Sequence, residues 1–143
     1  MILLDTNVVS EVYKPRPNPS ALAWLDAQPR ELLYLSTPVL AEMHFGLGLL
    51  DASARKERLR NSIDHLENEL YRNRILVFDV KAAAEYGRIA ASRQKAGRRL
   101  GQLDGLVAAI AIANGAILAT RDTRDFAELG LDLVNPFEPA VEH

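Results

Sequence analysis

Short apolar runs that end abruptly in polar residues are the feature that most constrains how this chain can fold. The first run, residues 2–4, stops at Asp5, and the turn-prone residues Thr6 and Asn7 follow it. Later runs of the same kind lie at residues 32–35, 75–78, 116–120 and, as a possible edge strand, around 133–134. Because each run is too short for a helix and is bounded by turn residues, we expect buried strands that end in loops.

Helical patterns fill the segments between these runs. We expect helices at residues 7–13, 20–28, 37–50, 54–73, 80–97, 103–114 and 126–129. Thr6 or Asn7 is the expected N-cap of the first helix, and Asp125, three residues before Glu128, has the spacing of a cap for the last. Strands that alternate with helices predict an α/β fold in which helices cover both faces of a central parallel sheet. The length suits a single domain, residues 1–143.

Composition excludes several classes of function. The chain has no cysteine, which rules out disulfides, thiol nucleophiles and cysteine-ligated zinc. The net charge is −2, so no overall positive field favours nucleic acid. We find no signal peptide, and the longest apolar stretch, residues 103–120, is too interrupted for a membrane span. We therefore expect a cytoplasmic protein with no membrane partner.

Four acidic residues with apolar neighbours are candidates for a shared site. Asp5 and Asp122 each follow a predicted strand, so both should lie at the same rim of the sheet, although a turn-forming role is the alternative. Glu42 lies beside the apolar stripe of the 37–50 helix; it either faces the site or extends into solvent. Asp104 lies in the first turn of its helix, where it could simply interact with the helix dipole.

A site built from these carboxylates would contain only oxygen donors. Hard oxygen ligands suit Mg²⁺ or Mn²⁺ rather than zinc. Crowded carboxylates repel one another unless a cation lies among them, so a metal would also hold the site together. Phosphodiester hydrolysis is the natural reaction, since a metal activates water and offsets charge on the phosphate. Three neighbouring polar residues could orient the ligands: Thr6, Asn7 and Thr120.

Four segments of this chain together form a recognisable pattern. They are Leu4-Asp5-Thr6-Asn7, Leu40-Ala41-Glu42, Leu103-Asp104-Gly105-Leu106-Val107-Ala108-Ala109 and Ala119-Thr120-Arg121-Asp122-Thr123-Arg124-Asp125-Phe126. In this order and spacing they resemble the four acidic motifs of the PIN domain, and the resemblance covers nearly the whole chain. Among PIN domains, the chain is most similar to the VapC-type bacterial toxins, including the FitB-like branch.

The resemblance implies an activity and a set of partners. It implies a Mg²⁺- or Mn²⁺-dependent endoribonuclease that acts as the toxin of a type II toxin–antitoxin module. The implied catalytic residues are Asp5, Glu42, Asp104 and Asp122, and the implied metal ligands are Asp5, Asp104 and Asp122. It also implies a homodimer, a small cognate antitoxin, and binding of promoter DNA only through that antitoxin. The chain departs from many relatives at residue 122, where they have asparagine.

RNA that approaches an acidic pocket needs a basic rim, and arginines lie near two of the carboxylates. Arg98 and Arg99 precede Asp104, and Arg121 precedes Asp122. We predict that these arginines contact RNA phosphates, with solvated loop residues as the alternative. Further basic residues that could contribute are Lys14, Arg16, Arg93, Lys95 and Arg124.

The helices between residues 38 and 73 carry more apolar positions than one buried stripe needs. These positions include Met43, Phe45, Leu47, Leu49 and Leu50. Core packing explains them most simply, and a groove for an amphipathic antitoxin segment is the functional alternative.

Two other functions stay open. Haloacid-dehalogenase-type phosphotransferases also place an aspartate after the first strand, but they need a second aspartate two residues later, where this chain has Asn7, and a later lysine that we cannot locate. A catalytically silent PIN-like subunit that only binds a partner would be favoured if a carboxylate were missing, and none is.

Overall fold

Five short parallel strands form the sheet that organises the molecule. The structure is a computed structural model that describes residues 1–139. The strands are β1 (Ile2–Leu4), β2 (Leu33–Ser36), β3 (Ile75–Leu76), β4 (Ile117–Ala119) and β5 (Leu133–Val134). Their order is β3-β2-β1-β4-β5, so β1 lies at the centre. The continuous apolar sequence of β1 fits this position, because a central strand is buried on both faces.

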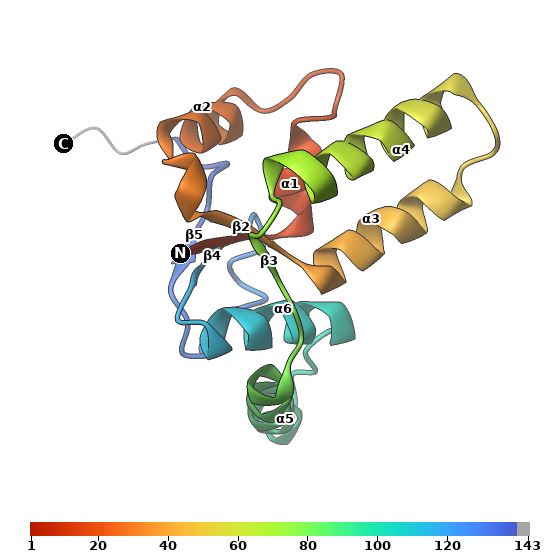
Figure 1. Ribbon diagram of the computed structural model, residues 1–143. Coiled ribbons are helices and arrows are strands. Elements are labelled where there is room, and N and C mark those ends of the chain that lie inside the picture. Colours follow the sequence, from red (N-terminus) through yellow and green to blue (C-terminus); the bar gives the residue numbers. More distant parts are fainter. Residues whose placement is uncertain (140–143) are drawn as a thin grey trace.

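Helices cover both faces of the sheet, as predicted. They are α1 (Thr6–Glu11), α2 (Pro19–Ala27), α3 (Thr37–Leu49), α4 (Ala54–His65), α5 (Val80–Lys95) and α6 (Gln102–Ala113). In Figure 1, α5 and α6 lie together below the sheet, α1, α2 and α4 lie above it, and α3 extends to the right from the end of β2 and forms a projecting hairpin with α4. A 3₁₀ turn (Arg30–Leu32) precedes β2. Among residues 1–139, no helix has both the length and the apolar character that would cross a membrane.

The order of the strands reverses beside β1. The chain first moves outward from β1 through β2 to β3, and then returns to the other side of β1 to form β4. In open α/β sheets, ligands bind outside the carboxyl ends of the strands at such a reversal. The register pairs Leu4 with Ala119, so the residues that follow these two strands meet at this reversal.

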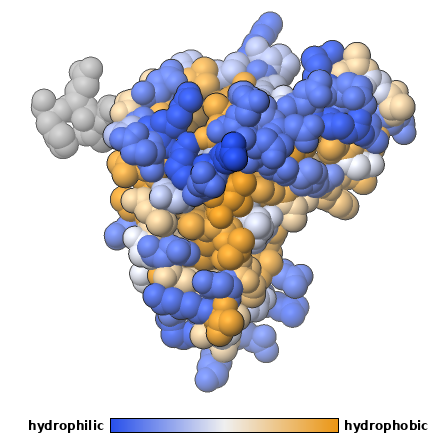
Figure 2. Space-filling model, viewed as in Figure 1, coloured by the Kyte–Doolittle hydropathy of each residue, from blue (hydrophilic) through white to orange (hydrophobic). Residues whose placement is uncertain are grey.

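Apolar side chains also remain exposed at one edge of the sheet. Figure 2 shows apolar surface on the face in front of β3, between the hydrophilic surfaces of the helices above and below. The segment after β3 contributes Val77, Phe78 and Val80, whose exposed fractions are 56%, 37% and 89%.

Several predicted boundaries were wrong, and one predicted helix is absent. Helix α1 begins at Thr6 with Asp5 as its N-cap, and helix α2 begins at Pro19, one residue before the predicted start, with Asn18 as its N-cap. Residues 126–129 form turns with Glu128 at φ 64°, so Asp125 does not cap a helix there. The charge-rich stretch after residue 54 is an α-helix only to His65, where a π-helical turn (Leu66–Leu70) continues it.

Candidate active site

Asp5 directly follows β1, at the rim where β1 and β4 end, and has two structural partners there. Its side chain is 6% exposed, and its backbone amide continues the sheet by donating to the carbonyl of Ala119 at 3.0 Å. The carboxylate accepts hydrogen bonds from the backbone N–H of Thr6 at 2.9 Å and from Thr120 Oγ1 at 2.8 Å. The first of these bonds caps α1. The turn-forming alternative for Asp5 is therefore correct, and it is compatible with a role in a site.

The end of β4 is tied to the end of β1 by short polar side chains. Thr120 Oγ1 accepts a hydrogen bond from the backbone N–H of Asp122 at 3.0 Å. Asn7 Nδ2 donates to Asp122 Oδ2 at 3.1 Å, and Asn7 Oδ1 accepts from the backbone N–H of Arg121 at 3.1 Å. Thr120 and Asn7 thus position Asp5 and the exposed Asp122 at one rim, where the sequence predicted that orienting residues would lie.

Glu42 lies at the outer edge of this rim on α3. Glu42 is exposed, which agrees with the solvent-facing alternative rather than with a core-facing side chain. The hydroxyl of Thr6 donates a hydrogen bond to Glu42 Oε2. Because Thr6 directly follows Asp5, this bond brings the second acidic motif next to the first.

Asp104 completes the acidic cluster from α6. Partial burial raises its pKa to about 6, and the negative charges of Asp5, Asp125, Asp122 and Glu42 add to this increase, in that order. The pKa of Asp5 is also raised, first by burial, although the hydrogen bonds from Thr120 and Thr6 oppose the shift. The four predicted carboxylates therefore lie close enough to repel one another, with one contributed by each of four separate segments.

The donor set suits a hard divalent cation, although the side chains do not form a complete cage. Within residues 1–139, no three histidine or acidic side chains lie close enough together to hold a metal ion by themselves. The carboxylates of Asp5, Asp122 and Glu42 all accept hydrogen bonds from neighbouring groups, but each accepts fewer than the four that a carboxylate can accept. Mg²⁺ is commonly held by one or two carboxylates with water completing its shell, which fits Asp5 and Asp104. The direct ligation by Asp122 stays a prediction.

Asp125 is an acidic neighbour whose spacing from Glu128 favoured a helix cap over a supporting role at the site. It raises the pKa of Asp104, and the two carboxylates line a cavity of about 220 Å³. No other sequence signal distinguished the two roles. The other residues that line the cavity are Arg93, Arg99, Leu100 and Gly101.

The predicted basic rim is only partly free for RNA. Arg98 is paired with Glu128, and the guanidinium of Arg121 lies 4.0 Å from the centre of the Phe137 ring and 3.5 Å from a carboxylate oxygen of Glu11. Arg99 is exposed and lines the cavity beside Asp104. The RNA-binding role of Arg98, Arg99 and Arg121 stays a prediction.

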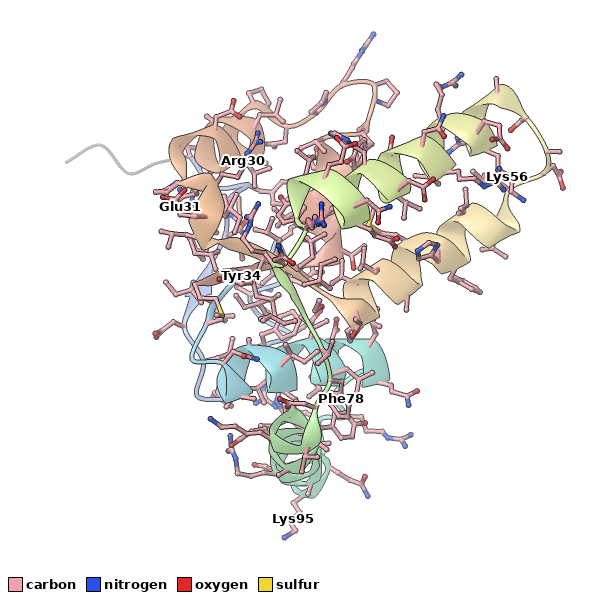
Figure 3. The ribbon with its side chains drawn as sticks, in the orientation of Figure 1. Arg30, Glu31, Tyr34, Lys56, Phe78 and Lys95 are labelled. Carbon is pink, nitrogen blue, oxygen red and sulfur yellow. The ribbon has the colours of Figure 1, made fainter. Side chains whose placement is uncertain are left out.

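Three of the other basic residues differ in their surroundings. Lys14 donates a hydrogen bond to the carboxylate of Glu11, a residue that is 3% exposed. This hydrogen bond is the largest of the effects that lower the pKa of Glu11. Arg93 is buried. Lys95, at the end of α5, points away from the body of the molecule (Figure 3).

The apolar residues of α3 divide between core and surface. Met43 and Leu47 are buried, as core packing requires, whereas Phe45 and Leu49 are 67% and 69% exposed. A further cavity of about 290 Å³ lies between α1, α2 and the π-helical turn, and none of the four carboxylates lines it. The acidic cluster, rather than this cavity, contains the groups that could carry chemistry.

Comparison with known proteins identifies the family. The sequence model for the PIN domain matches residues 2–131. The chain belongs to the PIN-domain family. It is 43% identical to VapC ribonuclease Y4jK of Sinorhizobium fredii, over 98% of this chain and all of the relative, and 38% identical to toxin FitB of Neisseria gonorrhoeae, over 96% and 99%.

Solved structures agree with this membership. A structure of FitAB bound to the IR36 DNA fragment matches this PIN domain with a TM-score of 0.92 at 38% identity, covering all of both chains. The predicted fold and the predicted resemblance to VapC and FitB are therefore confirmed. The haloacid-dehalogenase alternative is not supported, and Asn7 at its second required position bonds to Asp122 instead.

Proposed function

We propose that this chain is a divalent-metal-dependent endoribonuclease that acts as the toxin of a type II toxin–antitoxin module. The observation that carries the proposal is the convergence of Asp5, Glu42, Asp104 and Asp122 at the rim of β1 and β4. Four carboxylates that repel one another at a topological reversal have a clear use if they bind a cation and direct water at a phosphodiester. The relative named VapC ribonuclease, which aligns over its whole length, supports the same activity.

The residues of this chain have separate parts in that reaction. Asp5 and Asp104 would hold Mg²⁺ or Mn²⁺, and Asp122 would complete the acidic wall from the β4 side. When bound, the cation supplies Lewis acidity that strengthens water as a nucleophile and offsets charge on the phosphate. Thr120 and Asn7 keep Asp5 and Asp122 in fixed positions through their hydrogen bonds. The hydroxyl of Thr6 donates to Oε2 of Glu42, which would leave Oε1 of Glu42 to accept the proton of the attacking water.

The partners follow from the same proposal. We infer that the substrate is single-stranded or loop RNA, since its bases and backbone are accessible to an open rim. The FitAB complex on DNA supports a cognate antitoxin as the partner that carries DNA binding, with the PIN domain contacting promoter DNA only through it. We also propose that the toxin forms a homodimer. We propose a cytoplasmic location, because the RNA, the antitoxin and the promoter DNA would be encountered there.

Cleavage of RNA by the purified protein tests the activity. We expect cleavage with Mg²⁺ or Mn²⁺, none with excess EDTA, and loss of cleavage in Asp5→Asn. Asp26→Asn, an exposed carboxylate on α2, is the matched control and should cleave normally. RNA that stays intact with either metal would instead favour the catalytically silent partner-binding subunit.

A further inference from the structure

The cavity beside Asp104 contains cationic and backbone donors that the proposed reaction has not used. It lies where α5, the start of α6 and the turns after β4 meet, and its volume is about 220 Å³. We call it the Arg93–Arg99 pocket, after the two arginines that line it. Asp104 lies on its wall and is shared with the acidic site, so the pocket opens directly beside the proposed metal.

Arg93 is a buried cation whose donors are only partly used. Its side chain is 7% exposed, and its Nη2 donates to the backbone carbonyls of Asp125 and Ala127 at 2.9 and 2.6 Å. Within residues 1–139, Nε has no hydrogen-bond partner. No carboxylate lies within ion-pair distance of this guanidinium in the same residues, although Asp104 and Asp125 line the same cavity. Buried charges are normally paired directly, so this guanidinium favours an anion within the cavity.

The start of α6 adds an uncapped helix N-terminus beside the pocket. Gly101 is the N-cap of this twelve-residue helix and lines the pocket, and it has no side chain that could cap the first turn. The first intrahelical bond runs from the amide of Gly105 to the carbonyl of Gly101, which leaves the preceding amides as donors. Helix N-termini with free amides bind phosphate well. Arg99 reaches the pocket from the loop just before the helix.

We propose that the Arg93–Arg99 pocket binds a backbone phosphate of the RNA next to the phosphate that is cleaved, an inference that rests on the proposed nuclease function. Asp104 would contact the metal at one side of the pocket, while Arg93 and Arg99 would contact the neighbouring phosphate. This arrangement aligns the RNA backbone across Asp104. Arg99 is then a residue that positions the substrate. The proposal also predicts that cleavage needs at least one nucleotide beyond the scissile bond, on the side of the bond that lies in the Arg93–Arg99 pocket.

Titration with inorganic phosphate tests the pocket without any catalysis. At constant ionic strength and with Mg²⁺ present, we expect NMR signals of the Gln102 and Leu103 amides and of the Arg93 guanidinium to shift and saturate. Arg99→Gln should raise the dissociation constant for phosphate by about tenfold, the effect of losing one charge-assisted hydrogen bond. Arg88→Gln, which removes the same charge from an exposed position on α5, should titrate like the wild type. Shifts that do not saturate, or an Arg99→Gln titration that matches the wild type, would overturn the proposal.

RNA with single uncharged linkages separates this proposal from the nuclease assignment. We expect a methylphosphonate at one position beside the cleaved bond to raise KM by about tenfold in the wild type and to add little in Arg99→Gln. Cleavage that no neighbouring methylphosphonate affects would refute the pocket while leaving the nuclease intact. Phosphate that saturates the pocket of a protein unable to cut any RNA would refute the nuclease and leave an anion site.

Discussion

Asp5 combines a structural role with the proposed chemical one, and the two can be separated by substitution. It caps α1 through the amide of Thr6, and its carboxylate also lies close to that of Asp104. Asparagine caps helices about as well as aspartate, but it lacks the negative charge that a metal ligand requires.

We therefore expect Asp5→Asn to fold with near wild-type stability and to lose RNA cleavage. Asp5→Ala should lose both the cap and the activity, with a cost of about 1 kcal/mol in the free energy of unfolding. Urea denaturation and a cleavage assay on both variants check this. An Asp5→Asn protein that still cleaves RNA at the wild-type rate would show that the charge of Asp5 is not needed.

Asp104 should make the stability of the metal-free protein fall as pH rises. Its pKa is about 6 in the folded protein against 3.8 for an unperturbed aspartate, so the folded state binds the proton more tightly than the unfolded chain. Stability from this group is present below about pH 4 and is lost as pH rises through about 6. Because solvent screens a half-exposed group, we expect the free energy of unfolding to fall by about 1 kcal/mol over this pH range, which is less than the full pKa shift would give.

The matching variant is Asp104→Asn, measured in EDTA. It should be more stable than the wild type at pH 7.5 by about 1 kcal/mol and similar to it at pH 4. Asp64→Asn on the exposed face of α4 controls for the loss of one negative charge. Equal stability of Asp104→Asn and wild type at both pH values would contradict the repulsion that we infer.

At the scale of elements, the sequence predicted what depends on local patterns. The apolar runs predicted the strands, and the helix predicted from residue 80 begins there as α5, where the carboxylate of Asp79 accepts from the amide of Ala82 at 2.9 Å. The acidic motifs also came together as predicted, because parallel strands share one rim. Boundaries depended on cap geometry, and at α1 the capping carboxylate belonged to the site residue itself.

The segment after β4 could not be predicted, because a contact distant in sequence determines its shape. Asp125 and Glu128 have the spacing of a capping box, yet Arg93 from α5 donates to the carbonyls of Asp125 and Ala127 and holds the segment as turns. Long-range side-chain bonds of this kind leave no periodic signal. For the same reason the sequence analysis placed Arg93 in a basic rim, whereas the structure places it in the interior.

Replacing Arg93 should therefore loosen the segment that carries Asp122 and Asp125. We expect Arg93→Met, which retains most of the side-chain bulk, to lower the free energy of unfolding by about 2–3 kcal/mol, since two partly buried carbonyls lose a charged donor. Arg88→Met on the same helix should change stability by less than about 0.5 kcal/mol. Urea denaturation measures both, and similar values for the two variants would contradict the role of Arg93 in holding this segment.

At the scale of the whole molecule, the acidic site should couple the stability of the fold to the concentration of divalent cation. The carboxylates come from the segments that follow β1 and β4, from the second turn of α3 and from the first turn of α6, so they are brought together only in the folded chain. A cation that binds them stabilises the folded state by about 2.7 kcal/mol when its concentration is one hundred times its dissociation constant.

In the wild type, Mg²⁺ or Mn²⁺ should therefore raise the urea midpoint as its concentration rises. The gain should be larger at pH 7.5 than at pH 4, where Asp104 is protonated. The double variant Asp5→Asn/Asp104→Asn should show almost none of this gain, while Asp26→Asn/Asp64→Asn, with the same change in net charge at exposed positions, should show all of it. Equal stabilisation of both double variants would mean that the cation acts on general surface charge, and the acidic cluster would then lose its assignment as a metal site.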